Sequence, residues 1–503
     1  MYTNPFKTRS PVVPTPDVGG AAPTADALRA LFADCGDFQI RVLRLGLEGT
    51  RSVTVCWIDA LVDSETVTED VIRPLTELRR VSGAESEARS LARVLAGAVY
   101  NGSARSRDRL DDVSDDLTHG CCALIFDEIG RAVSFEARSG MARAVGEPTL
   151  EKSIKGAKDA FVETLRVNTA LVRRRLSTPS LKLRETSVGR RSHTRCALLW
   201  LEGVAAPEHV AALQKRLEAV DVDGITATGV LEEALADAPR SPFPQLLHTE
   251  RPDRFAQYLL EGRVGVLIDG LPIGLSSPVC FADFMRVTGD GCTNYLVATA
   301  LTALRYLALG LSLLLPALYV AVALYHQEMI PTRLLLSVIE AKRRVPFSTA
   351  LEVIGMLLSF ELLQEAGIRL PEPVGQTVSV IGALIVGQSA VEARVVSPIA
   401  IIVVAFAGIA GYTLPSQDLG AAVRLLRLAL VIAAVAAGLF GVGAGLCLVL
   451  LHLAEIDSCG LNYTAPLSDG AARPLQRLLL ILPRREDRRR DPALRSLDER
   501  RQR

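Results

Sequence analysis

The chain has 503 residues, room for two or three domains, and its 56 Lys and Arg balance 56 Asp and Glu, giving a pI near 7. The neutral net charge by itself says nothing about nucleic acid, and we expect no nucleic-acid partner. The charges are unevenly placed, with 77 in residues 1–305 and 16 in residues 306–454, which argues against a uniformly soluble protein and predicts a soluble half followed by a membrane half.

The first residues carry no targeting signal. Residues 1–23 are rich in Pro, Thr, Gly and Ala and predict a disordered leader. The first 30 residues contain no apolar stretch of the kind found in cleavable signals, so we expect the soluble half to stay in the cytoplasm. The nine cysteines form no C-x-x-C motif, and adjacent Cys121 and Cys122 cannot make an ordinary bridge, so we expect reduced thiols.

The soluble half shows a repeated pattern, which predicts two small ββα-type α/β subdomains. Strand-like segments at Phe38–Leu45 and Arg51–Trp57 precede an amphipathic helix, and the segments Leu181–Val188 and Thr194–Leu201 do the same about 143 residues later. Between these pairs we expect a helix at 106–117, strands at 121–126 and 132–137, and a long helix at 154–176.

The long helix ends in a run of arginines, Arg173-Arg174-Arg175. Such a run is most often a solvated helix end, which is the interpretation we favour. The alternative is that it docks on a partner or on anionic lipid headgroups.

Residues 251–298 are expected to join the two halves. Val264–Ile268 is strand-like and Asp269-Gly270 is typical of a turn. Because Asp269, Asp283 and two prolines interrupt residues 264–285, we expect a strand and turn with an interfacial helix there rather than a span.

Long apolar runs predict an α-helical multi-pass transmembrane domain. Charge-free runs occupy Tyr306–Tyr325, Val374–Val391, Val395–Leu414 and Leu428–Ala454, and a hydrocarbon core of about 30 Å needs about 20 apolar residues in a helix. Residues 346–366 are also apolar but carry Glu352, Glu361 and Glu365, which suit an interfacial helix, a re-entrant helix or one buried in an oligomer.

The number of spans stays open at four or five. Four spans place both termini inside, in agreement with nine Arg against five acids in the last 20 residues. They also place Lys342-Arg343-Arg344 outside, unless 346–366 or 264–285 crosses as well. The expected division is a leader at 1–23, subdomain 1 at 24–150, a linking helix with subdomain 2 at 151–250, the joint at 251–298, the transmembrane domain at 299–454 and a basic cytoplasmic tail at 455–503.

Polar residues within the third apolar region are candidates to line a pore. On a helix over 374–392, one stripe within about 80° contains Thr377, Ile381, Leu384, Gln388 and Glu392. The opposite stripe consists mostly of small residues, which favour a close helix neighbour. The first stripe is then left to face a lumen with an apolar neck. Alternatively, Gln388 and Glu392 cap the helix end or pair with Arg394.

Two further carboxylates, Glu328 and Glu361, are candidate functional groups within the membrane half. Glu361 is expected to face water inside a complex or to pair with Arg333 or Arg369. Gly441-x-x-x-Gly445 is expected to be a helix-packing motif. No pattern indicates a catalytic, cofactor-binding or metal site, so we expect neither an enzyme nor a cofactor.

Several long blocks closely resemble the GerA family of bacterial spore-germination proteins. These are SPFPQLLHTERPDRFAQYLLEGRVGVLIDG, LPALYVAVALYHQEMIPTRLLLS, FELLQEAGIRLPEPVGQTVSVIGALIVGQSAVEARVVSP and YTLPSQDLGAAVRLLR, and the likeness covers roughly residues 35–470. One departure is Lys155-Gly156-Ala157, where the family usually has an R-G-P start to its long helix.

The resemblance implies a channel-forming A-type subunit of a nutrient germinant receptor in the spore inner membrane. It further implies a homo-oligomer of about five subunits, a transporter-like B-type partner and a C-type lipoprotein partner. The related stage V sporulation AF-type role, beside the dipicolinate-release machinery, is equally compatible with the sequence. A non-conducting scaffold or a transporter-like component is the alternative from another functional class, although no inverted repeat of the membrane segments supports a transporter.

Overall fold

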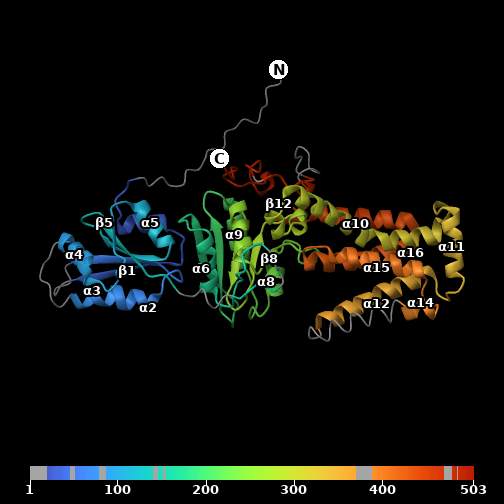
Figure 1. Cartoon of the computed structure of the whole chain (residues 1–503), viewed down its shortest axis with the longest axis horizontal. Helices are drawn as coiled ribbons and strands as arrows, with labels where there is room; N and C mark the ends of the chain where they lie inside the picture. Colours follow the sequence, from blue (N-terminus) through green and yellow to red (C-terminus); the bar gives the residue numbers. More distant parts are fainter. Residues whose placement is uncertain are drawn as a thin grey trace, which may run out of the picture.

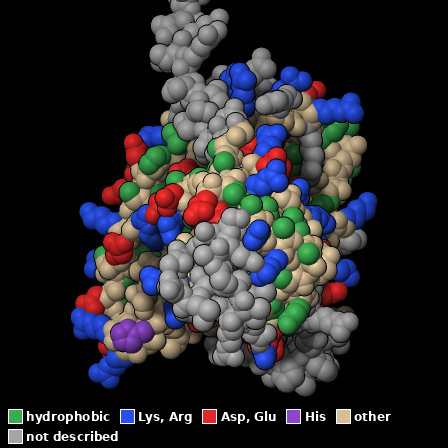
Figure 2. Space-filling model, turned by 90° about the vertical axis from the view of Figure 1, so that its left-hand side faces the viewer, with side chains coloured by type: hydrophobic (Ala, Val, Ile, Leu, Met, Phe, Trp, Pro, Cys, Tyr) green, Lys and Arg blue, Asp and Glu red, His purple; other side chains and the backbone are tan. Residues whose placement is uncertain are grey.

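The computed structural model describes residues 20–45, 51–78, 87–139, 146–149, 151, 155–369, 388–468, 478–483 and 485–502. Two β-sheets with their covering helices form the N-terminal part, and a group of long helices extends from the second sheet (Figure 1). The expected order of an α/β half followed by a helical half is therefore correct. Figure 2 shows charged side chains of both signs scattered over the end of the molecule formed by the first sheet, as expected for a surface in water.

The first sheet has five antiparallel strands in the order β1-β2-β4-β5-β3. The predicted strand pairs are confirmed almost residue for residue. The predicted helix at 106–117 begins later, because Arg105–Arg107 pairs with β5 as an edge strand. The elements are α1 (Ala25–Leu31), β1 (Phe38–Leu45), β2 (Arg51–Ile58), α2 (Ser64–Thr66), α3 (Arg73–Leu78), α4 (Glu87–Arg93), β3 (Arg105–Arg107), α5 (Leu110–Thr118), β4 (Cys121–Phe126) and β5 (Arg131–Glu136).

The second sheet repeats this topology in the order β6-β7-β9-β10-β8. The repeat is thus a whole five-stranded unit and larger than the predicted ββα motif. Residues 264–277 lie inside this sheet rather than in the predicted joint, because buried Val264–Ile268 pairs with β7. The elements are α6 (Leu165–Arg175), β6 (Leu181–Val188), β7 (Thr194–Leu201), α7 (Pro207–Glu218), α8 (Thr228–Leu235), β8 (Leu247–Thr249), α9 (Pro252–Glu261), β9 (Val264–Ile268) and β10 (Gly274–Ser277).

The predicted long helix at 154–176 is helical only from Leu165. Before it, the backbone N–H of Phe161 donates to the carbonyl of Glu250 (2.7 Å). The buried Asn168 side chain accepts from the N–H of Val162 (2.8 Å) and donates to its carbonyl (2.5 Å). These bonds hold residues 161 and 162 in an irregular conformation, which prevents the helix from starting earlier.

The two sheets are joined at a buried ion pair. Arg173 at the end of α6 donates from Nε and Nη2 to both oxygens of Asp37, at 2.7 and 2.8 Å, and their side chains are only 1% and 6% exposed. Beside this pair, Gly36 donates to the carbonyl of Leu183 in β6. Arg173 is therefore neither a solvated helix end nor a docking group, and both interpretations of it were wrong, because the end of α6 faces the loop that precedes β1.

The helical half contains fewer established spans than predicted. Of the helices in the described ranges, two, α10 and α16, are long and apolar enough to cross a membrane, so four or five spans are not confirmed. Residues 374–387 of the predicted pore segment lie outside the described residues. The helices are α10 (Tyr295–Tyr325), α11 (Thr332–Lys342), α12 (Thr349–Arg369), α14 (Ala390–Glu392), α15 (Pro398–Tyr412) and α16 (Gln417–Glu455).

Helix α16 is folded into two antiparallel arms at Gly438, whose φ of 61° and ψ of −140° are not helical. A Cβ placed on Gly441 would overlap the carbonyl oxygen of Ala433, and one on Gly445 would lie 2.6 Å from Cδ2 of Leu430. In a straight helix residues 433 and 441 would be about 12 Å apart. The predicted span at Leu428–Ala454 therefore straddles a turn, and Gly441-x-x-x-Gly445 packs the arms together as predicted.

Replacing Gly441 by Ala is expected to destabilise the helical half by about 1–3 kcal/mol. The added methyl group meets a backbone carbonyl that cannot move without separating the two arms of α16. Thermal unfolding of the detergent-purified protein measures the effect. Gly443→Ala is the matched control, because its Cβ meets no atom within 4 Å. Equal unfolding temperatures for both variants would contradict the close approach of the arms.

The soluble and helical halves share one hydrophobic core. Phe243, Leu247 and Phe284 from the sheet side pack with Leu419 and Leu453, which lie at the two ends of α16. Because both ends of the α16 hairpin enter this cluster, the second sheet and the hairpin are in direct mechanical contact.

The C-terminal residues, predicted to form a basic cytoplasmic tail, pack against the second subdomain. After the short strands β11 (Asp457–Ser458) and β12 (Leu461–Asn462), Ser496 donates to the carbonyl of Glu261 and the N–H of Leu497 donates to the carbonyl of Val204. Arg490 donates to the carbonyl of Leu260. Arg490 also pairs with Asp498 (3.0 Å) and Arg501 with Glu261 (3.0 Å), so neighbouring carboxylates offset part of the arginine charge.

Candidate functional site

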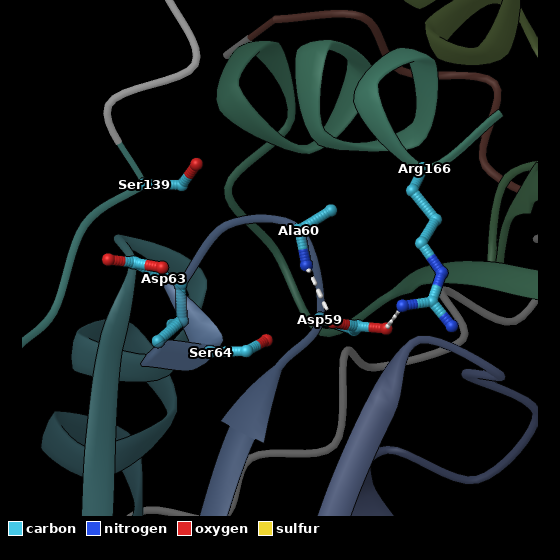
Figure 3. Close-up of a pocket in the computed structure, with 7 residues that line it drawn as sticks. Asp59, Ala60, Asp63, Ser64, Ser139 and Arg166 are labelled. Carbon is cyan, nitrogen blue, oxygen red and sulfur yellow. Dashed lines mark hydrogen bonds and ion pairs between the residues drawn. The ribbon is translucent and has the colours of Figure 1, made fainter. Parts of the chain in front are cut away.

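An open pocket of about 510 Å³ lies where the two subdomains meet. Asp59 follows β2 of the first sheet, and Arg166 extends toward it from the first turn of α6 (Figure 3). An oxygen of Asp59 lies 2.7 Å from a guanidinium nitrogen of Arg166. The lining residues are Asp59, Ala60, Val62, Asp63, Ser64, Ser139 and Arg166.

Turn geometry after β2 presents the acidic side of the pocket. Ala60 has a positive φ of 68°, and its N–H donates to the carboxylate of Asp59 (3.1 Å). Asp63 accepts from the N–H of Glu65 (3.2 Å) and the hydroxyl of Thr66 (2.8 Å), so it caps α2. The pocket thus offers carboxylate, guanidinium and hydroxyl groups, which suit a small polar or zwitterionic molecule.

Neither Asp59 nor Arg166 was predicted from the sequence. Asp59 carries a weak local signal, since an acid follows directly on a strand in the run Trp57-Ile58-Asp59. Arg166 carries none, because only the packing of α6 against the first subdomain brings it near Asp59. Within the described ranges, no group of three His, Cys, Asp or Glu side chains is placed to hold a metal ion.

In the helical half, Glu352 is buried between two helix starts. Glu352 lies in the first turn of α12 and is only 3% exposed. One oxygen accepts from the hydroxyl of Ser397 (2.8 Å), the N-cap residue of α15, and lies 3.4 Å from its backbone N. The positive ends of both helix dipoles favour a carboxylate here, so Glu352 ties α12 to α15.

Glu361 is paired with two arginines that the sequence did not single out. Its carboxylate lies 2.7 Å from Arg427 and 3.4 Å from Arg424, both in the first arm of α16. Arg333 is not the partner, because α12 lies beside that arm, and the side chain of Arg369 lies outside the described residues. The Arg427 side chain is 3% exposed, whereas those of Glu361 and Arg424 are 36% and 32% exposed, so the cluster runs from the bundle interior to its surface.

The remaining candidate residues are placed only in part. Glu328 is exposed just beyond α10, 3.5 Å from His326. Gln388 and Glu392 are both exposed beside α14. Thr377, Ile381 and Leu384 lie outside the described residues, so the pore-lining stripe stays a prediction.

Two histidines connect the second subdomain to the two arms of α16. Nδ1 of His248, in β8, lies 3.1 Å from the carboxylate of Asp418 in the first arm. Nε2 of His452, in the second arm, lies 2.8 Å from the hydroxyl of Ser241. Neither histidine has a role that the sequence could predict, because each partner is remote in the chain.

The His248–Asp418 contact is expected to make the junction pH-dependent. The hydrogen bond to Asp418 raises the pKa of His248, while burial opposes this and Glu232 and Glu151 add to the rise. The stabilisation is therefore complete below the unfolded pKa of about 6.5 and is lost as pH rises through the raised folded value. Because the pair is partly exposed, it contributes about 1 kcal/mol or less to the free energy of unfolding.

Thermal unfolding of the wild-type chain and of His248→Gln, compared across this pH range, measures the contribution. The advantage of the wild-type chain should shrink as pH rises. An advantage that is constant with pH would show that the pair does not stabilise the junction.

Comparisons with known proteins give matches over most of the chain. The family described as "Bacillus/Clostridium GerA spore germination protein" matches residues 26–493. Spore germination protein KA of Bacillus subtilis (strain 168) is 32% identical over 466 residues, which cover 93% of this chain and 85% of that protein. The uncharacterized membrane protein YfkQ of the same organism is 36% identical over 442 residues, covering 88% of this chain and 85% of that protein.

A solved structure also matches. It is the crystal structure of the N-terminal domain of the A subunit of the Bacillus megaterium spore germinant receptor GerK3. The two chains are 27% identical with a TM-score of 0.40, and the match covers 51% of this chain and 93% of that one.

Proposed function

Because the chain belongs to the GerA family of spore germination proteins, we propose that it is a channel-forming A-type subunit of a nutrient germinant receptor. It lies in the spore inner membrane, with the two sheets on the cytoplasmic side and the helical half in the bilayer. Its partners are a transporter-like B-type subunit and a C-type lipoprotein. The length of α10 and the apolar character of α10 and of both arms of α16 support membrane insertion.

The observation that carries the channel proposal is the charged cluster on the surface of the helical bundle. Glu361 and Arg424 keep about a third of their side chains exposed, and the exposed residues next to them in the chain include Leu362 and Leu425. A charge facing lipid near the bilayer centre costs roughly 2.5–3.5 kcal/mol on insertion scales. Their environment in the membrane is therefore water or another subunit.

A closed ring of identical subunits provides that environment. Cyclic symmetry turns one polar stripe per subunit into a shared lumen, and exposed Gln388 and Glu392 contribute polar groups to the same half. The family resemblance gives the expected number of about five subunits. In the soluble half, the pocket beside Asp59 and Arg166 is placed to receive a small polar ligand, and the shared core at the α16 ends passes its effect to the bundle.

Ion flux from proteoliposomes that contain the purified chain tests this proposal. Leu384→Glu should hydrate the apolar neck of the predicted pore and raise the leak, while native mass spectrometry should record a closed oligomer. A flux equal to that of protein-free liposomes for both proteins, together with a monomer in the spectrum, would favour the non-conducting scaffold.

A further inference from the structure

Helix α11 is unusual because none of its side chains is buried. It lies at the end of the helical half farthest from the two sheets and runs across the direction of α10, α15 and α16 (Figure 1). It has 11 residues, and isolated helices shorter than about 12–15 residues are marginal in water. Another surface must therefore cover part of α11 in the native setting.

The length of α10 places α11 at the edge of the bilayer. The charge-free run Tyr306–Tyr325 has 20 residues, which span about 30 Å as a helix, the thickness of the hydrocarbon core. Tyr325 at its end is the residue type that favours the headgroup level. Helix α11 begins at Thr332, after one short turn of 3₁₀-helix at Gln327–Met329.

The side chains of α11 divide into the faces that an interfacial helix needs. Leu335, Val338 and Lys342 follow helical spacing on the half-buried face, and Lys342 interacts electrostatically with Glu352 of the bundle. Leu336 and Ile339 are exposed on the flank, at 62% and 44%. Met329, Leu334 and Phe347 add exposed apolar area in and around the helix.

Basic residues dominate the charged part of this segment. Arg333, Arg343 and Arg344 are exposed, and within the described ranges no hydrogen bond or ion pair joins their side chains to the rest of the chain. Helix α11 itself contains one acid, Glu340. Exposed apolar flanks beside unpaired arginines match a surface of acyl chains under anionic headgroups.

We propose that α11 and its flanking residues dock on the anionic phospholipid surface on the side of the membrane opposite the two sheets. The inference rests on the proposed membrane insertion but not on ion conduction. It also accounts for the basic run Lys342-Arg343-Arg344 on the side that the positive-inside tendency disfavours, because Arg343 and Arg344 anchor a surface helix next to a span.

Tryptophan quenching by brominated phosphatidylcholine tests the docking in vesicles that contain the full-length chain. The native Trp57 and Trp200 lie in β2 and β7 of the soluble half, so they report no lipid contact. The tryptophan introduced by Leu336→Trp should lose most of its own emission, whereas the tryptophan introduced by Ser337→Trp, on the polar face, should keep it. Phe406→Trp, at an exposed site within α15, reports membrane insertion independently.

The outcomes separate the two proposals. Quenching of Phe406→Trp without quenching of Leu336→Trp would overturn the docking alone. The same holds if the emission of the tryptophan at position 336 is blue-shifted but unquenched, because a second copy of the chain then covers it instead of lipid. No quenching of either would remove the membrane insertion on which the docking rests, and the docking with it.

The charge component is tested by adding phosphatidylglycerol to the vesicles. Quenching of Leu336→Trp should increase with this anionic lipid, and Arg333→Gln/Arg343→Gln/Arg344→Gln should abolish the increase. The control variant Arg41→Gln/Arg44→Gln/Arg89→Gln removes the same charge from exposed sites in the soluble half. It should leave the increase in quenching unchanged. An increase that survives loss of the three α11 arginines, or no increase at all, would overturn recognition of anionic lipid.

Discussion

Asp37→Asn is expected to destabilise the contact between the two subdomains by about 3–5 kcal/mol, because it leaves Arg173 charged and buried without its counter-ion. The guanidinium is 1% exposed and loses both of its bonds to a carboxylate. A further bond, to the carbonyl of Thr178 at 3.3 Å, is long and weaker. Water cannot reach the site to solvate the charge that remains.

Thermal unfolding of the full chain, followed by intrinsic fluorescence, measures this effect. Trp57 lies in the first sheet and Trp200 in the second, so variants that keep one tryptophan each report the two subdomains separately. Both should unfold earlier in Asp37→Asn. Asp37→Leu/Arg173→Met should recover much of the loss, because apolar groups can replace a buried pair.

Asp26→Asn is the matched control. The side chains of Asp26 and Arg29 are 92% and 49% exposed, so this pair should contribute less than about 1 kcal/mol to the free energy of unfolding. If Asp37→Asn unfolds at the same temperature as Asp26→Asn, the buried pair does not hold the subdomains together.

Glu361→Gln is expected to destabilise the helical half by about 1–3 kcal/mol, because Arg427 loses its charged partner at a site that is only partly exposed. Arg427 is 3% exposed among apolar helices, and Glu361 is its nearest counter-charge at 2.7 Å. The loss should appear as a lower temperature at which the detergent-purified protein leaves solution, measured by size-exclusion chromatography after heating.

Two further variants make this result specific. Glu361→Gln/Arg427→Met removes the stranded charge and should restore much of the stability. Glu328→Gln removes an acid that is 73% exposed beside His326 and should have little effect. Loss of stability in the double variant equal to that in Glu361→Gln would show that Arg427 is not the group left uncompensated.

Local signals in the sequence predict the parts of the structure that depend on neighbouring residues. The strand pair Leu181–Val188 and Thr194–Leu201 is confirmed to the residue, because alternating apolar residues and the turn at Gly189 mark a hairpin within a short stretch. The run Tyr306–Tyr325 predicts a long apolar helix for the same reason. The blocks that resemble the GerA family are also continuous stretches of sequence, so family membership follows from the sequence alone.

The candidate site was predicted less well, because its contacts join distant residues. Glu361 is marked by its apolar surroundings, but its partner Arg427 depends on how α12 lies against α16. Asp59 and Arg166 meet only across the two subdomains. The pore-lining stripe lies mostly outside the described residues, so that prediction remains open.

The strand hairpins, the apolar segments and the family can be recognised without a structure, since each depends on residues close together in the chain. The five-stranded repeats, the burial of Arg173 against Asp37 and the fold of α16 into a hairpin depend on contacts between distant residues. Glycine at 438 permits that turn without requiring it. The turn forms because Gly441 and Gly445 let the two arms approach closely, and such packing is a property of surfaces brought together by the fold.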